Sequence, residues 1–389
     1  MINNNKIFSL VLTGIISLTI AIGIGRFSYT PILPFMLEEL ELTKTQGGLI
    51  ASSNFFGYLL GSLIPILPIF PNKIRNLFLF SIIICVFTFF LMGLAQTLNL
   101  FILLRFIHGF FSAFVLILGT SIILPHIQEL GKIFLSTAHF SGVGLGMVLS
   151  SLLVSLLGTY NFNWSELWIA IGILSVLLSF QIFKFIPHEK KLSNISISKV
   201  HKSKIGFTFI SVSYCLYGFG YVGFGTFIST MARTTPNLEI TEPYVWLVVG
   251  LFGIPSVFFW NWFGEKIGND ISLFLSCSIM GGGILISGYY NTIFGIIFSC
   301  ILFGITFVPI TSMCLLEGQK RFNGSFIVST AILTSCFSIG QIIGPYLAGF
   351  ISDKTGSFNI AMNVSAFILF FGSFLMLSPK RFKFLKYNP

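Results

Sequence analysis

Long apolar stretches follow one another along most of the chain, and short polar gaps separate them. A transmembrane helix needs about 20 mostly apolar residues. Twelve stretches of that size are present: 7–37, 45–69, 75–96, 99–125, 133–158, 165–186, 206–231, 243–264, 271–290, 293–316, 325–351 and 358–378. The pattern predicts an all-α integral membrane protein with twelve transmembrane helices.

Composition supports lipid as the main solvent of this protein. Of its 389 residues, 54% are hydrophobic and only 9% are charged, whereas about 25% of the residues of a soluble domain are charged. A soluble core could not hide this much apolar surface, because surface must grow with the size of the chain. The first apolar stretch is too long for a signal peptide, and no A-x-A-like site follows it, so we predict an uncleaved first helix.

Basic residues are divided unequally between the two predicted sides of the membrane. With a cytoplasmic N-terminus, the cytoplasmic side receives seventeen of the 22 Lys and Arg residues, and the outer side receives only Lys44, Arg233 and Lys354. Basic loops stay in the cytoplasm, so we predict both termini on that side of a bacterial cytoplasmic (inner) membrane. The net charge of +10 then reflects topology, and we expect the lipid bilayer and no nucleic acid as a partner.

The longest polar gap divides the twelve stretches into six and six. This gap, "PHEKKLSNISISKVHKSK" at 187–204, is rich in Lys and Ser, as is typical of a solvated linker. We predict an N-terminal six-helix bundle over 1–186, a cytoplasmic linker over 187–205, and a C-terminal six-helix bundle over 206–389.

The two halves also resemble each other in sequence. "GIGRFSYTPILPFM" begins at Gly23 and "GFGYVGFGTFISTM" begins at Gly218, and at this offset of 195 Arg26 corresponds to Tyr221. The fifth and eleventh stretches each carry a G-x-x-x-G pair, beginning at Gly142 and Gly340. Internal repeats of this kind are common in transporters, and they predict two six-helix pseudo-repeats.

Several motifs resemble those of the major facilitator superfamily (MFS). "LLRFIHGFFSAF" at 103–114 is similar to its fourth-helix R-x-x-x-G motif through Arg105 and Gly109, and "GQIIGPYLAGFISDKTGSF" at 340–358 is similar to its eleventh-helix signature. "FGEKIG" at 263–268 resembles a worn copy of the G-x-x-x-D-R-x-G loop motif, and its first-half counterpart after Gly61 lacks the acidic residue. "GRFSYTPILPFM" and "SSNFFGYLLGS" further resemble the bacterial YbfB/YjiJ-type branch. The resemblance implies the MFS fold, alternating access around a central cavity, proton coupling and a monomer.

Arg26 is the most unusual residue in the first stretch. An arginine in the middle of a transmembrane helix costs about 2.5–3.5 kcal/mol on insertion scales. No Asp or Glu lies well inside any of the twelve stretches, and the next acid, Glu38, is about 18 Å away along a helix. Arg26 therefore needs backbone carbonyls, water or a bound anion. We predict that Arg26 and the nearby Tyr29 contact the solute; the alternative is a structural or snorkelling arginine.

Arg105 and His108 are candidates for coupling or gating. They lie three residues apart and share one face of the fourth helix. A histidine beside a cation could act as a proton switch, and the alternative is an arginine that binds backbone carbonyls next to a bystander histidine. His139 in the fifth stretch is a further candidate for the same role.

Other polar side chains in the stretches are candidates to line a solute cavity. Asn54 and Tyr58 share a face of the second helix, Tyr217 and Tyr221 follow helical spacing in the seventh, and Gln341 lies deep in the eleventh. Such groups line solute sites, but they also make ordinary bonds between helices. The five tryptophans lie near the ends of stretches and are expected to be interfacial anchors: Trp164, Trp168, Trp246, Trp260 and Trp262.

These features favour a secondary active transporter for a small organic solute, with an anion as one candidate. The resemblance implies that it is driven by protons, as a symporter or antiporter. The alternative is a proton-driven efflux pump for drugs or metabolites, although the fifth helix lacks the G-P pair expected of such exporters. A channel or a non-transporting receptor is the rival from a different class. We expect no enzyme, no cofactor and no metal site, because the embedded set is two arginines and two histidines without acids.

Overall fold

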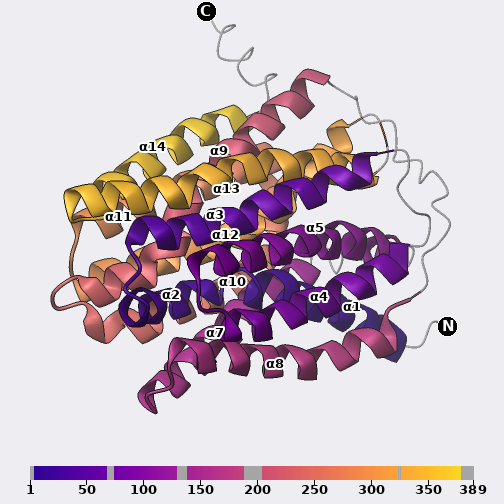
Figure 1. Cartoon of the computed structure of the whole chain (residues 1–389). Coiled ribbons are helices and arrows are strands. Elements are labelled where there is room, and N and C mark those ends of the chain that lie inside the picture. The colour runs from indigo at the N-terminus through magenta and orange to yellow at the C-terminus, as the bar shows by residue number, and fades with distance from the viewer. Residues whose placement is uncertain are drawn as a thin grey trace, which may run out of the picture.

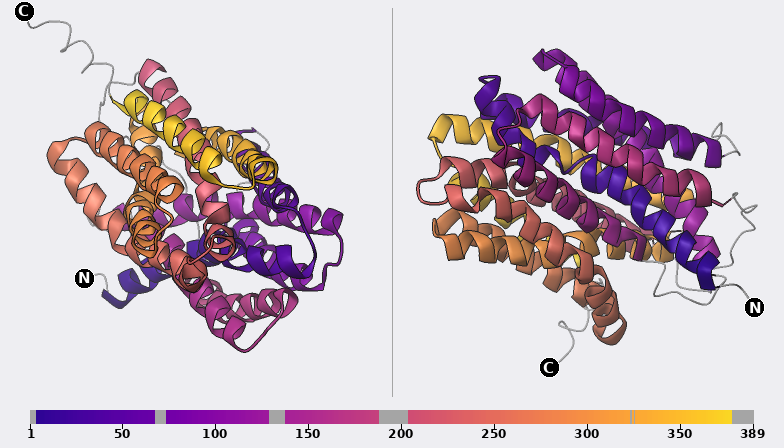
Figure 2. Two further views of the ribbon diagram at one scale, coloured as in Figure 1. Left: turned by 90° about the vertical axis from the view of Figure 1, so that its left-hand side faces the viewer. Right: turned by 90° about the horizontal axis from the view of Figure 1, so that it is seen from below.

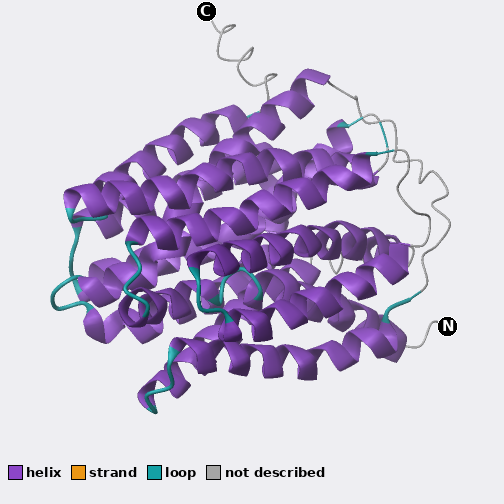
Figure 3. Ribbon diagram, viewed as in Figure 1, coloured by secondary structure: helices purple, strands orange, loops and turns teal. Residues whose placement is uncertain are grey.

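The computed structural model describes residues 4–67, 74–128, 138–187, 204–322, 324 and 326–377. Over these residues helices joined by short loops make up the chain, and no strand is present (Figures 1 and 3). Twelve segments are long and apolar enough to cross a membrane, which confirms the predicted number. The elements are α1 (Asn4–Leu18), η1 (Thr19–Ile24), α2 (Tyr29–Glu39), α3 (Lys44–Leu63), η2 (Ile64–Ile66), α4 (Ile74–Leu94), α5 (Leu98–Gln128), η3 (Ala138–Phe140), α7 (Ser141–Thr159), α8 (Trp164–Phe185), α9 (Lys204–Thr234), η4 (Glu239–Thr241), α10 (Glu242–Ile267), α11 (Asn269–Tyr289), α12 (Ile293–Arg321), α13 (Phe326–Thr355) and α14 (Asn359–Met376).

The N-terminal and C-terminal helices gather on different sides of the molecule (Figure 2). The two sets meet mainly where α3 packs along α13 and where α7 packs along α10. Glycines permit close approach of the helices at both places, because a Cβ on Gly48 would lie 2.4 Å from the Pro345 carbonyl oxygen and one on Gly144 would lie 2.9 Å from the Ile254 nitrogen. The predicted linker at 187–205 falls almost wholly outside the described residues, so the domain boundaries remain predictions.

The first membrane span is broken in its middle. Between α1 and α2 the chain forms the π-helix η1 and then an irregular turn over 25–28. The N–H of Gly25 bonds to the carbonyl of Ile20, and the N–H of Arg26 bonds to the carbonyl of Ile22. Neither hydrogen bond uses the carbonyl of Ala21, which is therefore free to accept from another donor. Pro31 follows directly and supplies no N–H of its own.

The corresponding span of the second half, α9, is a continuous helix of 31 residues. The hydroxyl of Thr30 donates to the carbonyl of Gly225 at 2.6 Å, and these two residues are 195 positions apart. Residues that correspond in the two repeats thus touch each other. The helices that carry the G-x-x-x-G pairs cross the first spans in both halves, because a Cβ on Gly142 would meet Ile15 and one on Gly340 would meet Cys215. The predicted six-helix pseudo-repeats are confirmed.

Candidate solute-binding site

Arg26 lies between aromatic rings at the meeting point of the two halves. Its side chain is buried, with 5% of its surface exposed. The guanidinium carbon lies 4.2 Å from the ring centre of Tyr58 and 4.9 Å from that of Phe55, both on α3. The hydroxyl groups of Tyr58 and of Tyr221, on α9, both interact with the guanidinium. Aromatic rings close to the guanidinium therefore stabilise its charge.

One edge of this guanidinium has no partner. Neither Nε nor Nη2 of Arg26 makes a hydrogen bond. These two N–H groups point the same way in the plane of the guanidinium, which is the fork that binds a carboxylate with two parallel bonds. No acid compensates the charge, since Glu317 alone among the described acidic residues is buried and it pairs with Lys320 and Arg321.

Arg105 on α5 holds the broken part of the first span. Its Nη1 donates to the carbonyl of Gly25 at 2.7 Å, and its Nη2 donates to the carbonyl of Arg26 at 3.2 Å. Its guanidinium also lies over the ring of Tyr29, 4.9 Å from the ring centre. Buried carbonyls need donors, and Arg105 supplies two of them where the helix is interrupted.

His108 holds the same segment one turn further along α5. Its Nε2 lies 3.2 Å from the carbonyl oxygen of Ala21, the group that η1 leaves free, and its Nδ1 lies 2.9 Å from the hydroxyl of Thr88. Because a carbonyl oxygen only accepts, Nε2 carries a hydrogen. The Thr88 hydroxyl also lies 2.7 Å from the carbonyl of Cys85.

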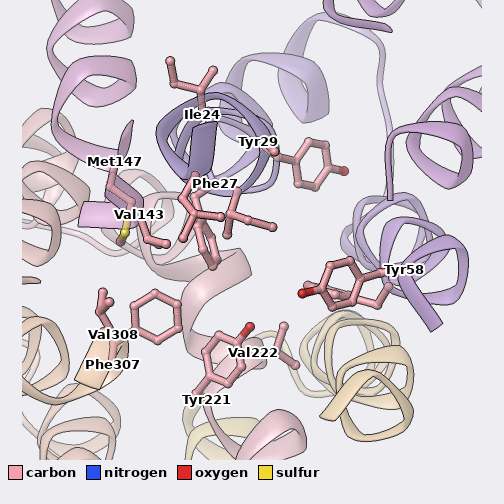
Figure 4. Close-up of a cluster of buried hydrophobic side chains, with 14 of the residues drawn as sticks. Ile24, Phe27, Tyr29, Tyr58, Val143, Met147, Tyr221, Val222, Phe307 and Val308 are labelled. Carbon is pink, nitrogen blue, oxygen red and sulfur yellow. The ribbon is translucent and has the colours of Figure 1, made fainter. Parts of the chain in front are cut away.

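The other predicted site residues of the N-terminal half differ in how many of their polar atoms already make hydrogen bonds. The hydroxyl of Tyr29 donates to the carbonyl of Gly47 at 2.9 Å, and this hydroxyl points away from Tyr221 in Figure 4. Asn54 donates through Nδ2 to the carbonyl of Arg105 at 2.9 Å, and its Oδ1 has no partner. His139 lies apart from this group, with Nε2 3.3 Å from the hydroxyl of Thr120.

The C-terminal half contributes Tyr221 and Gln341 to the site. Gln341 Nε2 donates to the Tyr221 hydroxyl, while Gln341 Oε1 is buried without a partner. The Tyr217 hydroxyl instead donates to the carbonyl of Phe307 at 2.7 Å. Figure 4 shows the hydroxyls of Tyr58 and Tyr221 pointing toward a common space beside Phe27 and Phe307.

The expectation that all five tryptophans are interfacial anchors is wrong. Trp168 and Trp246 are fully buried, and Trp246 packs 5.6 Å from Phe27 and 6.4 Å from Phe303 between ring centres. Trp260 is buried as well, and its Nε1 donates to the carbonyl of Ile305 at 2.7 Å. Pro309, four residues later, provides no N–H for that carbonyl. Hydropathy places a tryptophan along a span but does not show which side of the helix it occupies.

Sequence reasoning missed the aromatic side chains around Arg26. Phe27, Phe55 and Phe307 looked like ordinary apolar positions in a chain with 47 Phe residues, and Trp246 was expected at the membrane interface. The only available signal was position, because Phe27 follows Arg26 and Phe55 is one turn from Tyr58. Within the described residues, no group of three His, Cys, Asp or Glu side chains could hold a metal ion.

Polar contacts join the two halves at the end that contains Asp353. The Asp353 carboxylate accepts from the backbone N–H groups of Lys44 and Thr45 at 3.3 and 2.8 Å, and from the Thr45 hydroxyl at 2.5 Å. These donors belong to the first turn of α3, where helical N–H groups lack internal partners. Arg233 on α9 pairs with Glu38 on α2 at 3.1 Å. We call these contacts the Asp353 gate.

Comparison with known proteins places this architecture in a family. The model of the family described as "Uncharacterised MFS-type transporter YbfB" matches residues 18–377. Two solved structures of the nucleoside transporter NupG are similar in fold. A mutant of NupG has a TM-score of 0.72 and 16% identity, and the match covers 96% of this chain and 99% of that chain. NupG itself has a TM-score of 0.69 and 15% identity, and the match covers 99% of this chain and 100% of that chain. No curated protein sequence matches the chain. The match over nearly the whole chain, together with the twelve spans, shows that this protein belongs to the family of the MFS-type transporter YbfB and is a multi-pass membrane transporter.

Proposed function

We propose that this protein is a secondary active transporter that moves a small organic anion by alternating access, and that Arg26 binds the acidic group of the solute. The unpaired Nε–H and Nη2–H edge of Arg26 carries this proposal. A buried charge without a partner is costly, and a carboxylate at this edge would compensate the charge and accept both hydrogens. Tyr221 would extend the contact to the C-terminal half, so that one solute touches both halves.

Coupling to protons belongs to the same proposal, with His108 and His139 as the groups that take up the proton. The contacts of His108 suit either protonation state. When Thr88 donates to Nδ1 the ring is neutral, and when Thr88 donates to the Cys85 carbonyl, Nδ1 can carry a hydrogen and donate to the hydroxyl. Arg26 and Arg105 oppose a cationic ring, and an anion bound at Arg26 would reduce that opposition. Anion and proton would then be carried together.

Binding by purified variants tests the role of Arg26. Thermal stabilisation by a panel of carboxylates, phosphates, sugars, amines and nucleosides identifies a ligand. Arg26→Gln should then weaken binding by about 2–5 kcal/mol, and Arg26→Lys should lose most of it too, because an ammonium lacks the planar fork. Arg75→Gln is the matched control, since its guanidinium is half-buried near Ile186, away from the site. Unchanged binding by Arg26→Gln would make Arg26 structural.

The panel also decides between this proposal and the nucleoside named in the NupG structures. A nucleoside carries no acidic group for the Arg26 fork. Stabilisation by neutral nucleosides that survives Arg26→Gln would favour that solute instead.

Transport and topology need separate measurements. Counterflow of the identified labelled solute in proteoliposomes distinguishes a carrier from a channel or a receptor, because it requires alternating access. We propose cytoplasmic termini in the inner membrane, so a reporter fused after Lys199 should be cytoplasmic and one near Asn237 external; a periplasmic signal after Lys199 would contradict the topology.

A further inference from the structure

An unbroken series of aromatic side chains leads away from Arg26. Tyr221 lies 5.0 Å from Phe307 between ring centres, Phe307 lies 5.2 Å from Phe27, and Phe27 lies 5.6 Å from Trp246. All four are at least 95% buried. Phe27 comes from the first half and the other three come from the second, so the series crosses the interface between the halves. Figure 4 shows Phe27, Phe307 and Tyr221 of this series.

We propose that the solute is an aromatic or heteroaromatic carboxylate, whose acid binds the Arg26 fork and whose ring packs among Phe27, Tyr221 and Phe307. The inference rests on the proposed function and adds the chemical class of the body of the solute. Rings pack edge-to-face or offset with about 0.5–1.5 kcal/mol beyond simple burial, and the Phe27–Phe307 pair already meets at 85°.

Two side chains at this series carry a buried polar atom without a partner: Trp246 is its last ring, and Gln341 binds the hydroxyl of Tyr221. The buried Nε1 of Trp246 has no acceptor, and Oε1 of Gln341 has no donor. A sugar or another polyol would bring many hydroxyls into an aromatic surrounding that offers few partners, and buried polar groups without partners are costly. A flat ring with one acid and one or two polar substituents suits these two unpaired groups better, because Trp246 and Gln341 could each serve one substituent.

Four small probes separate the acid from the ring. Benzoate has both features, cyclohexanecarboxylate has only the acid, benzamide has only the ring, and acetate is a minimal acid. We expect the purified protein to bind benzoate at least fivefold more tightly than cyclohexanecarboxylate and at least tenfold more tightly than benzamide, by titration calorimetry. Indole-3-acetate and 4-hydroxybenzoate extend the test to larger and more polar rings.

Substitutions show which residues bind the ring of benzoate and which bind its acid. Phe307→Leu should reduce the preference for benzoate over cyclohexanecarboxylate to less than twofold, while Phe294→Leu, at an exposed position, should leave it unchanged. Arg26→Gln should abolish the preference for benzoate over benzamide.

Each outcome has a distinct meaning. Equal binding of benzoate and cyclohexanecarboxylate would overturn the aromatic class and leave the anion proposal intact. Equal binding of benzoate and benzamide would overturn the anion proposal itself. If none of the aromatic carboxylates binds, the inference is wrong.

Discussion

The first spans of the two halves occupy corresponding places but differ in almost every chemical respect. The first span of the N-terminal half is interrupted at η1, contains Arg26 and carries two prolines in α2. Its counterpart α9 is unbroken and presents Tyr214, Tyr217 and Tyr221 as a stack of nearly parallel rings. Arg26 and Tyr221 are 195 residues apart, and they meet across the interface.

The difference between the two spans shows that a break in a helix provides free backbone carbonyls. The interrupted span frees the carbonyls of Ala21, Gly25 and Arg26, and the side chains of Arg105 and His108 bind to them. The unbroken span frees none, and it supplies aromatic surface and hydroxyl groups instead. One half thus fixes a cation in the membrane, and the other provides a ring-lined surface opposite. Broken helices at the centre of transporters commonly form solute sites in this way.

The largest effect should follow from removing the group that holds the break. Arg105→Met leaves the carbonyls of Gly25 and Arg26 without their donors, at a cost of about 1–3 kcal/mol for each. We expect a large fall in the melting temperature of the detergent-solubilised protein. The control Arg75→Met loses one long contact of 3.4 Å and should melt within a few degrees of the parent. Equal melting of the two variants would show that the break does not depend on Arg105.

A second test compares glycines at corresponding positions of the two spans. A Cβ on Gly25 would lie 2.2 Å from Nε2 of His108, and a Cβ on Gly220 would lie 2.4 Å from Cγ of Leu369. Both alanine variants should lose about 1–3 kcal/mol through overpacking. Only Gly25→Ala displaces His108, so it alone should alter the pH dependence of solute uptake. A change of the same size in Gly220→Ala would remove His108 from the explanation.

Much of this arrangement follows from the sequence, and the remainder depends on tertiary contacts. Twelve spans and the duplication could be predicted because hydropathy and glycine spacing are local properties of the chain. Pro31 and Pro34 lie close to Arg26 in the sequence. Which carbonyls are freed nevertheless depends on the register of η1, and their donors come from α5, about 80 residues later. Arg26 could be recognised as unpaired because the embedded acids are missing from the sequence itself. The aromatic partners could not, since Phe27 and Phe307 resemble the many other phenylalanines of the chain.

The Asp353 gate includes the ion pair between Glu38 on α2 and Arg233 on α9, so the contact between the first spans of the two halves can be tested at their ends. Asp353→Asn keeps the shape but removes the charge that faces the first turn of α3, an interaction of about 0.3–1 kcal/mol with the end of a helix. The halves should then separate more often at this end, and a thiol-reactive reagent should label Ser229→Cys, at a buried position one turn before Arg233, severalfold faster. Ser335→Ala is the control, since it removes the Ser62–Ser335 contact between the same two helices, nearer their other end. If Ser229→Cys is labelled at the same rate alone, with Asp353→Asn and with Ser335→Ala, the gate does not hold this end closed.

A proton-coupling test distinguishes the two histidines. His108→Gln should uncouple uptake from a pH gradient while counterflow continues, because the amide can still bind a carbonyl but cannot carry a proton. His139→Gln, away from Arg26, should have the smaller effect. Gradient-driven uptake that survives in both variants would exclude histidine coupling.

The smallest expected effect separates two neighbouring tyrosines of α9. Tyr217→Phe loses one hydrogen bond to the carbonyl of Phe307, which is worth about 0.5–1.5 kcal/mol of stability, and its ring stays in the stack, so benzoate binding should be unchanged. Tyr221→Phe removes the hydroxyl that meets Arg26 and Gln341. Its stability should fall by about 1–3 kcal/mol, because the buried Nε2 of Gln341 loses its acceptor. Benzoate affinity should also change by a few-fold, because the fork of Arg26 and the side chain of Gln341 lose a group that orients them. Paired melting and titration measurements on the two variants give the answer. If Tyr217→Phe alters binding as much as Tyr221→Phe does, the site extends further along α9 than Arg26 reaches, and the division between a structural and a solute-facing tyrosine is wrong.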